Sequence, residues 1–200
     1  MKASPLAAFH RANAVTYLSL TCAIAAIAGA SRGHAPVAGA LIAVSVIADT
    51  FDGRFARLFA RSEMDRQLGV QLDSLSDAIA FGVAPALCMT LLASAGSTPA
   101  QLAWWAAVIL FAACAITRLS FYNVTHEETP GFVGLPAPVA ALVWSTLLLG
   151  HPDAVTSVAV LMGAAVAMVL PIPVPRPKGV ALTLFVLWPI VVALAHLRRV

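Results

Sequence analysis

The sequence predicts an all-α membrane protein, a bundle of about six to seven transmembrane helices. The first observation is composition: hydrophobic residues make up 60% of the 200-residue chain, charged residues 10%, and the mean hydropathy is +0.90. Soluble domains carry about 25% charged residues, so the charges here are too few to cover a water-facing surface. This composition excludes a soluble enzyme, a disordered regulator and a secreted disulfide scaffold. We expect residues 1–200 to form one integral-membrane domain, with Cys22, Cys88 and Cys114 packed inside its apolar segments.

The second observation is a series of apolar stretches near the length of about 20 residues that a spanning helix needs. In chain order the seven candidates are residues 13–31, 35–58, 69–95, 101–122, 132–150, 153–172 and 179–197. The first has no small-residue cleavage site after a short apolar core, so we expect a retained helix and not a signal peptide. A charged link, residues 58–68, separates the second stretch from the third.

The other stretches end where turn-forming or proline-containing sequence prevents a helix from continuing. These breaks are residues 31–33, 94–99, 129–131, 151–153 and 171–177. We expect the proline run 171–177 to be an exposed connector, and the isolated histidines at loops or helix ends, His196 among them, to lie at the membrane interface.

Basic residues indicate the orientation, because Lys and Arg are enriched in cytoplasmic loops. With the N-terminus inside, nine basic residues fall on the inner side and three on the outer side. The inner set is Lys2, Arg11, Arg54, Arg57, Arg61, Arg66, Arg118, Arg176 and Lys178, and the outer set is Arg32, Arg198 and Arg199. We therefore expect a cytoplasmic N-terminus. No basic patch with interleaved aromatic residues occurs, so no nucleic-acid partner is expected.

Four aspartates indicate where the chemistry lies. Asp49 and Asp52, spaced i and i+3, end the second stretch, and Asp73 and Asp77, spaced i and i+4, begin the third, so each pair occupies one helix face. The short link makes the two helices neighbours, with both pairs at the same cytoplasmic surface. By the lenient insertion scale, four carboxylates in apolar helices cost on the order of 10 kcal/mol unless something neutralises them.

Two interpretations of these acids remain open from the residues alone. In one, they are interfacial helix-end acids paired with Arg54, Arg57 and Arg61. In the other, hard divalent cations, which prefer oxygen ligands, neutralise them. Small residues on the same faces, namely Gly53, Ala56 and Gly69, leave room for a ligand against the backbone. Four acids with two metals at a membrane surface would suit phosphoryl-group displacement.

The two aspartate blocks resemble a known signature. Residues 49–57 (DTFDGRFAR) and 69–77 (GVQLDSLSD) are similar to the DxxDGxxAR…GxxxDxxxD signature of the CDP-alcohol phosphatidyltransferases, with a longer spacer between the blocks. Within that family, residues 72–85, 118–123 and 134–138 are similar to segments of bacterial, membrane-embedded phosphatidylserine synthases, although Ser120-Phe121-Tyr122 departs from that pattern. The resemblance covers about residues 13–150 and implies a membrane catalytic domain of this type.

The resemblance implies transfer of a phosphatidyl group from CDP-diacylglycerol to L-serine, giving phosphatidylserine and CMP. Two divalent ions, Mg²⁺ or Mn²⁺, would be held by Asp49, Asp52, Asp73 and Asp77, with Asp77 also the general base. The nucleotide-binding set would be Asp49, Asp52, Gly53, Ala56, Arg57, Gly69 and Asp73. It also implies a bacterial inner membrane location with the active site facing the cytoplasm, contact with membrane lipids, and a homodimer.

The acceptor is less constrained than the donor. Arg118 could bind the carboxylate of serine, with the Asn123 amide assisting, or Arg118 could be one more positive-inside anchor. A sister enzyme would use glycerol 3-phosphate, inositol phosphate or another alcohol with the same donor. A rival of another class is a divalent-metal transporter, which predicts acids near the bilayer midplane and access from both faces.

Overall fold

The computed structural model describes residues 9–92, 98–125, 131–175 and 178–200. Residues 94–97, 129–130 and 176–177 of the predicted breaks, and Lys2 and Arg176 of the inner basic set, lie outside the described residues. The all-α prediction is confirmed. The described helices are α1 (Ala14–Ala30), α2 (Ala35–Ala56), α3 (Glu63–Asp77), α4 (Ala84–Leu92), α5 (Thr98–Thr125), α6 (Ala137–Leu148), α7 (Ala154–Val169) and α8 (Val180–Leu197).

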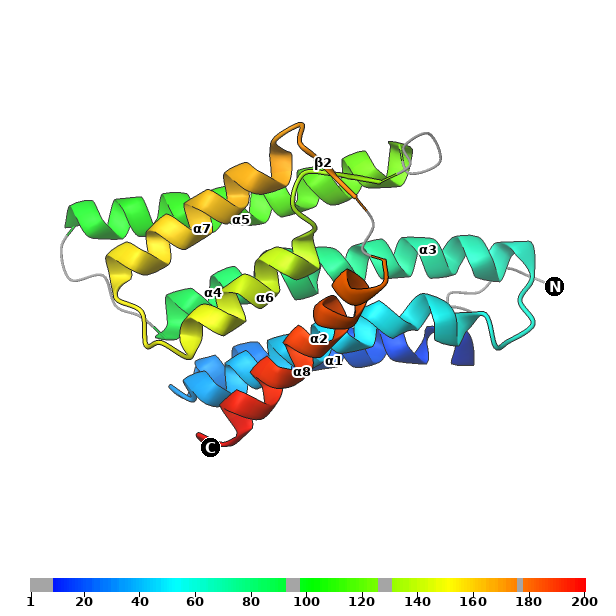
Figure 1. Cartoon of the computed structure of the whole chain (residues 1–200), viewed down its shortest axis with the longest axis horizontal. Helices are drawn as coiled ribbons and strands as arrows, with labels where there is room; N and C mark the ends of the chain where they lie inside the picture. Colours follow the sequence, from blue (N-terminus) through cyan, green and yellow to red (C-terminus); the bar gives the residue numbers. More distant parts are fainter. Residues whose placement is uncertain (1–8, 93–97, 126–130, 176–177) are drawn as a thin grey trace.

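Three short elements complete the described chain. A 3₁₀ turn, η2 (Arg11–Asn13), precedes α1, and a π-helical segment, η3 (Ala78–Val83), joins α3 to α4. The strands β1 (Phe132–Val133) and β2 (Pro173–Val174) form an antiparallel pair. Figure 1 shows α5 and α7 along one side of the bundle, α1, α2 and α8 along the other, and α3, α4 and α6 between them.

Within the described residues, five helices are long and apolar enough to cross a membrane, and this length and composition indicate an integral membrane protein. They are Arg11–Ala30, Ala35–Ala56, Glu63–Leu92, Ala100–Thr125 and Val180–Leu197. The other two of the seven predicted stretches are helical but shorter, with 12 residues in α6 and 16 in α7. At 1.5 Å per residue α6 reaches only about 18 Å, against a hydrocarbon core of about 30 Å.

Two helix starts differ from the prediction by five or more residues. Helix α3 begins at Glu63 and not at residue 69, because Ser62 and Asp65 form a capping box: the Asp65 N–H donates to Ser62 Oγ at 3.2 Å, and the Ser62 N–H donates to Asp65 Oδ2 at 3.0 Å. Helix α6 begins at Ala137 and not at residue 132, because Gly134 has a φ of +71° and Pro136 keeps the preceding residue extended. The charged link is therefore shorter than expected, and residues 132–133 are strand.

The proline run is only partly the exposed connector that the sequence predicts. Pro173 and Val174 pair with Val133 and Phe132, because prolines favour the extended backbone of an edge strand. The Gly134 N–H donates to the Ile172 carbonyl at 2.9 Å and the Leu135 N–H to the Ala167 carbonyl at 2.8 Å. This pair of strands therefore joins the segment before α6 to the segment after α7.

Close backbone approaches hold the bundle together. A Cβ built on Gly82 in η3 would lie 3.2 Å from the Ala115 Cβ, so the missing side chain lets α5 pack against the π segment. Pro85, in the first turn of α4, has no N–H to donate, which accounts for the irregular turn after Asp77. The π segment therefore brings α5 close to α3 just beyond the second aspartate pair.

His196 is an exception to the predicted interfacial histidines. The residue is only 1% exposed, its Nε2 lies 2.9 Å from the Ser145 carbonyl oxygen, and a Cβ on Gly39 would overlap its ring. The glycine on α2 thus leaves a slot for the imidazole of α8. The predicted packing role of the three cysteines is confirmed, since all three are buried and free.

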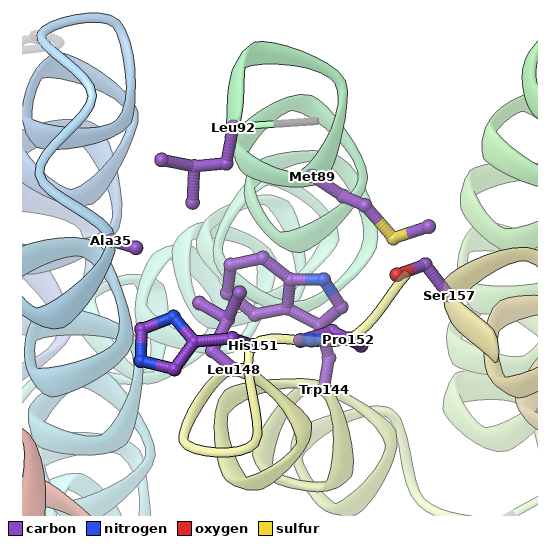
Figure 2. A pocket seen from close by; sticks show the side chains of 8 residues that line it. All are labelled: Ala35, Met89, Leu92, Trp144, Leu148, His151, Pro152 and Ser157. Carbon is purple, nitrogen blue, oxygen red and sulfur yellow. The ribbon is translucent and has the colours of Figure 1, made fainter. Parts of the chain in front are cut away.

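A cavity of about 210 Å³ lies at the end of the bundle where α2 begins. It is lined by Ala35, Met89, Leu92, Trp144, Leu148, His151, Pro152 and Ser157. Figure 2 shows the Trp144 indole at its centre, with Ser157 and Met89 approaching from one side. Ala35 and Asp49 are 14 residues apart on one helix, about 21 Å along its axis, so this cavity is separate from the aspartates.

Candidate active site

The carboxylates of the two predicted pairs, from the last turns of α2 and the C-terminal half of α3, come together. One carboxylate oxygen from each of Asp49, Asp52 and Asp73 lies within 4.8 Å of the other two. Asp77 is outside that group of three, but its carboxyl is within hydrogen-bonding reach of Asp49, and the Asp73 carboxyl is within reach of Asp52. The two pairs therefore form one cluster of half-buried carboxylates.

The cluster fits a hard divalent cation. Its donors are all carboxylate oxygens, the ligands that Mg²⁺ and Mn²⁺ prefer. Asp73 Oδ1 is buried and has no hydrogen-bond partner in the described part of the chain. An oxygen in that position is costly unless a donor or a cation meets it. The residues present thus have the chemistry and spacing to hold metal.

Arginines do not neutralise these acids. Among residues 9–92, 98–125, 131–175 and 178–200, the one ion pair is Arg66 with Glu63, at 2.5 Å between Nη2 and Oε2. Arg54 and Arg57 are exposed on the last turn of α2 and at its end. The interpretation of the four aspartates as ordinary helix-end ion pairs is therefore wrong for the described residues.

A polar stripe on α1 faces the cluster, and sequence analysis missed it. Thr16 Oγ1 donates to Asp52 Oδ2 at 3.1 Å, and Ser19 exchanges hydrogen bonds with Ser45 of α2. Asn13, Thr16 and Ser19 are 4%, 6% and 2% exposed. Asn13 ends η2 and Thr16 and Ser19 lie in α1, and their spacing of three residues in an otherwise apolar segment was the available signal, since it puts the three polar side chains on one face.

The two signature glycines do different things. A Cβ on Gly53 would meet nothing within 4 Å, so the space beside Asp52 is open. A Cβ on Gly69 would lie 3.3 Å from Asn13 Oδ1 and 3.6 Å from Arg61 Nη1, so this glycine lets α1 approach α3. Ala56 is buried. Only Gly53 thus leaves room for a ligand, while Gly69 shapes the wall.

Arg118 lies beside the cluster and is buried, with 6% of its surface exposed. Its Nε and Nη2 are buried and find no hydrogen-bond partner in the described ranges. The guanidinium carbon is 5.6 Å from the ring centre of Tyr122 and 5.7 Å from that of Phe132, and Asp77 is within electrostatic range. An interfacial anchor would be solvated, so the buried guanidinium fits a ligand-binding group better.

Asn123 is exposed and also faces α3. Its Nδ2 donates to Ser74 Oγ at 2.8 Å, and Ser74 directly follows Asp73. The C-terminal part of α5 therefore lies along the same stretch of α3 that carries the second aspartate pair. The structure thus places Arg118 near Asp77 and Asn123 against the neighbouring Ser74 on α3.

Comparison with known proteins points to one family. A family model described as CDP-alcohol phosphatidyltransferase matches residues 9–195. The CDP-diacylglycerol–serine O-phosphatidyltransferase of Mycobacterium tuberculosis is 36% identical over 143 residues, covering 68% of this chain and 48% of the relative. The enzyme of the same name from Helicobacter pylori is 33% identical over 143 residues, covering 72% of this chain and 58% of the relative.

An archaeal relative is similar over the same length. The archaetidylserine synthase of Methanothermobacter thermautotrophicus is 32% identical over 142 residues, covering 70% of this chain and 58% of the relative. The chain spans about half the length of the curated relatives it matches.

Proposed function

The chain belongs to the CDP-alcohol phosphatidyltransferase family, and from that premise we propose that it transfers a phosphatidyl group from CDP-diacylglycerol to L-serine, giving phosphatidylserine and CMP. The observation that carries the proposal is a cluster of carboxylates beside a buried guanidinium whose Nε and Nη2 have no hydrogen-bond partner among the described residues. Two of the relatives described above are named for serine as acceptor, which supports the choice of alcohol.

Asp49, Asp52, Asp73 and Asp77 would hold two divalent cations, Mg²⁺ or Mn²⁺. Cations bound there would neutralise the pyrophosphate and the charge that develops on the transferring group. Thr16 would keep the Asp52 carboxylate in place through its 3.1 Å hydrogen bond. The fully carboxylate donor set and the unpartnered Asp73 Oδ1 support this assignment.

The donor nucleotide would lie against the last turns of α2. The open space over Gly53 would admit it beside Asp52 and Arg57, and Ala56 and Gly69 would complete the nucleotide-binding set as small residues. A larger side chain at Gly53 would occupy the same space. By this argument the signature glycine serves ligand binding more than helix packing.

Asp77 would act as the general base. The serine hydroxyl gives its proton to the Asp77 carboxylate as its oxygen attacks the lipid-side phosphorus of CDP-diacylglycerol. One oxygen–phosphorus bond forms and the bond to the CMP oxygen breaks, so CMP leaves. Asp77 lies one helical turn beyond Asp73 and is the aspartate within electrostatic range of Arg118, which supports a base on the acceptor side of the cluster.

Arg118 would bind the carboxylate of L-serine and Asn123 would assist through its amide. A guanidinium offers two parallel N–H groups to a carboxylate, and here two of its nitrogens are buried without partners among the described residues. The excess of basic residues near the α2–α3 connection supports a site that faces the cytoplasm in a bacterial inner membrane.

The test is CMP release from CDP-diacylglycerol by purified protein in detergent with Mn²⁺, comparing L-serine, glycerol 3-phosphate and inositol phosphate. We expect release that depends on serine and stops with a chelator. Asp77→Asn should abolish release, while Asp153→Asn, which keeps an N-cap residue on α7 far from the cluster, should not. CMP release with another alcohol in place of L-serine would change the assigned acceptor substrate. No CMP release from folded protein with any of the three alcohols would overturn the proposal.

A further inference from the structure

We propose that Phe132 and Tyr122 are positioning residues that hold the Arg118 guanidinium for the carboxylate of the acceptor, with the β1–β2 strand pair fixing Phe132. The inference rests on the proposed function and extends it to residues outside the aspartate signature. Three observations carry it: the burial of Arg118, the geometry of the two rings, and the origin of Phe132 on a separate segment of the chain.

A buried arginine without ion-pair partners needs another source of stabilisation. The side chain of Arg118 is 6% exposed, and it forms no ion pair with the described residues. The faces of aromatic rings attract a cation through their quadrupole, and this attraction uses no N–H donor. Ring contacts therefore hold the charge in place while leaving Nε and Nη2 available.

The two rings act together. The ring centres of Tyr122 and Phe132 are 5.5 Å apart with planes tilted by 37°, and each lies within 5.7 Å of the guanidinium carbon. Tyr122 is one turn after Arg118 on α5, so helix geometry alone brings that ring alongside. Phe132 belongs to a different segment and must be brought there by tertiary structure.

The strand pair brings Phe132 to the arginine. Phe132 is paired with Val174, and the segment after it is fastened by hydrogen bonds from Gly134 to Ile172 and from Leu135 to Ala167. Gly134 adopts a positive φ and packs against the Met168 carbonyl, so no side chain fits at this turn. The placement of the guanidinium thus depends on contacts to the end of α7 and the segment that follows it.

This arrangement favours a planar anion. A guanidinium held by its aromatic contacts presents two adjacent N–H groups in a fixed direction, which matches the two oxygens of a carboxylate. A phosphate can accept the same pair of hydrogen bonds, so the acceptor comparison must include both chemistries.

The experiment compares Phe132→Leu, which removes the ring face, with Phe132→Tyr, which keeps it. Phe121→Leu is the matched control, because Phe121 is a phenylalanine on α5, the helix of Arg118, but is 50% exposed. We expect Phe132→Leu to raise the KM for L-serine about tenfold, with the KM for CDP-diacylglycerol unchanged. Phe132→Tyr and the Phe121 control should keep both wild-type values. If Phe132→Leu does not fold, Tyr122→Leu, which removes the ring, is compared with Tyr122→Phe, which keeps it, and the same difference in the KM for L-serine is expected.

The outcomes separate the two proposals. Serine-dependent wild-type turnover with an unchanged KM for serine in Phe132→Leu would overturn this inference and leave the proposed function standing. A fall in kcat with equal changes in both KM values would also overturn it, because it would indicate a general structural role. Wild-type release with glycerol 3-phosphate but not serine would overturn the carboxylate assignment, and no wild-type release with any acceptor would overturn the proposed function itself.

Discussion

Replacing Thr16 by valine removes one hydroxyl next to the carboxylate cluster and little else. Thr16 is 6% exposed in α1, and its Oγ1 donates to Asp52 Oδ2 at 3.1 Å. Valine keeps the branched shape of the side chain but cannot donate, so Asp52 loses the group that fixes its orientation. We expect weaker binding of divalent cations with the helix packing retained.

The size of the effect follows from the kind of hydrogen bond. A hydrogen bond to a charged group contributes about 1.5–3 kcal/mol, which corresponds to about a tenfold to a hundredfold change in a binding constant. Residues that orient metal ligands typically cost about 10–100-fold in metal affinity when they are lost, which is the same range. We therefore expect the Mn²⁺ dissociation constant of Thr16→Val to rise about tenfold or more.

The assay is a calorimetric titration of purified protein in detergent with Mn²⁺. Thermal unfolding of each variant checks that it is folded. Thr16→Ser restores the hydroxyl and should bind as the wild type does. Thr21→Val is the control on the same helix, because the Thr21 hydroxyl is exposed and donates to the Tyr17 carbonyl. Wild-type Mn²⁺ affinity in Thr16→Val would refute the reasoning, as would an equal loss in Thr21→Val.

Three further predictions follow from the glycines and the carboxylates. Gly53→Leu should leave thermal stability unchanged but raise the KM for CDP-diacylglycerol about tenfold or more, because the leucine side chain would fill the open space. In the control Gly163→Leu, where a Cβ would also meet nothing within 4 Å, stability and the KM should both stay unchanged. An unchanged KM for CDP-diacylglycerol in Gly53→Leu would contradict the pocket assignment. Gly134→Ala should destabilise the folded protein more than Gly33→Ala does. Both glycines have a positive φ, for which alanine costs about 1–2 kcal/mol, but of the two only Gly134 lies against a carbonyl. Equal shifts in Tm for the two variants would argue against the tight turn at Gly134. Mn²⁺ at about 100 times its dissociation constant should stabilise the wild type by about 2.7 kcal/mol in thermal unfolding, and Asp73→Asn should lose most of that gain; an unchanged gain in the variant would remove Asp73 from the metal site.

Parts of the fold that depend on local rules were predictable. The apolar runs, the turn residues between them and the spacing of the aspartates all concern neighbours along one helix, so they identify the helices and the shared face of each pair. The capping box at Ser62 was also readable from the sequence, and its omission placed the start of α3 six residues too late. The start of α3 had been placed where the apolar stretch begins, but the first turns of this helix are polar.

Contacts between distant residues were beyond prediction. Thr16 and Asp52 are 36 residues apart, Ser145 and His196 are 51 apart, and the strand partners Phe132 and Val174 are separated by two helices. Nothing in the local pattern says which polar face of one helix meets which acid of another. His196 was expected at the interface for this reason, since the Gly39 slot that buries it lies on α2.

The sequence by itself determined an all-α membrane bundle and a four-aspartate signature, because helix formation and helix-face spacing depend on residues within a few positions of one another. The tertiary structure alone decided what surrounds that signature: the Thr16 hydroxyl on Asp52, the open space over Gly53 and the aromatic contacts of Arg118. These depend on how α1, α5 and the β1–β2 pair pack against α2 and α3, and packing is a property of the whole chain.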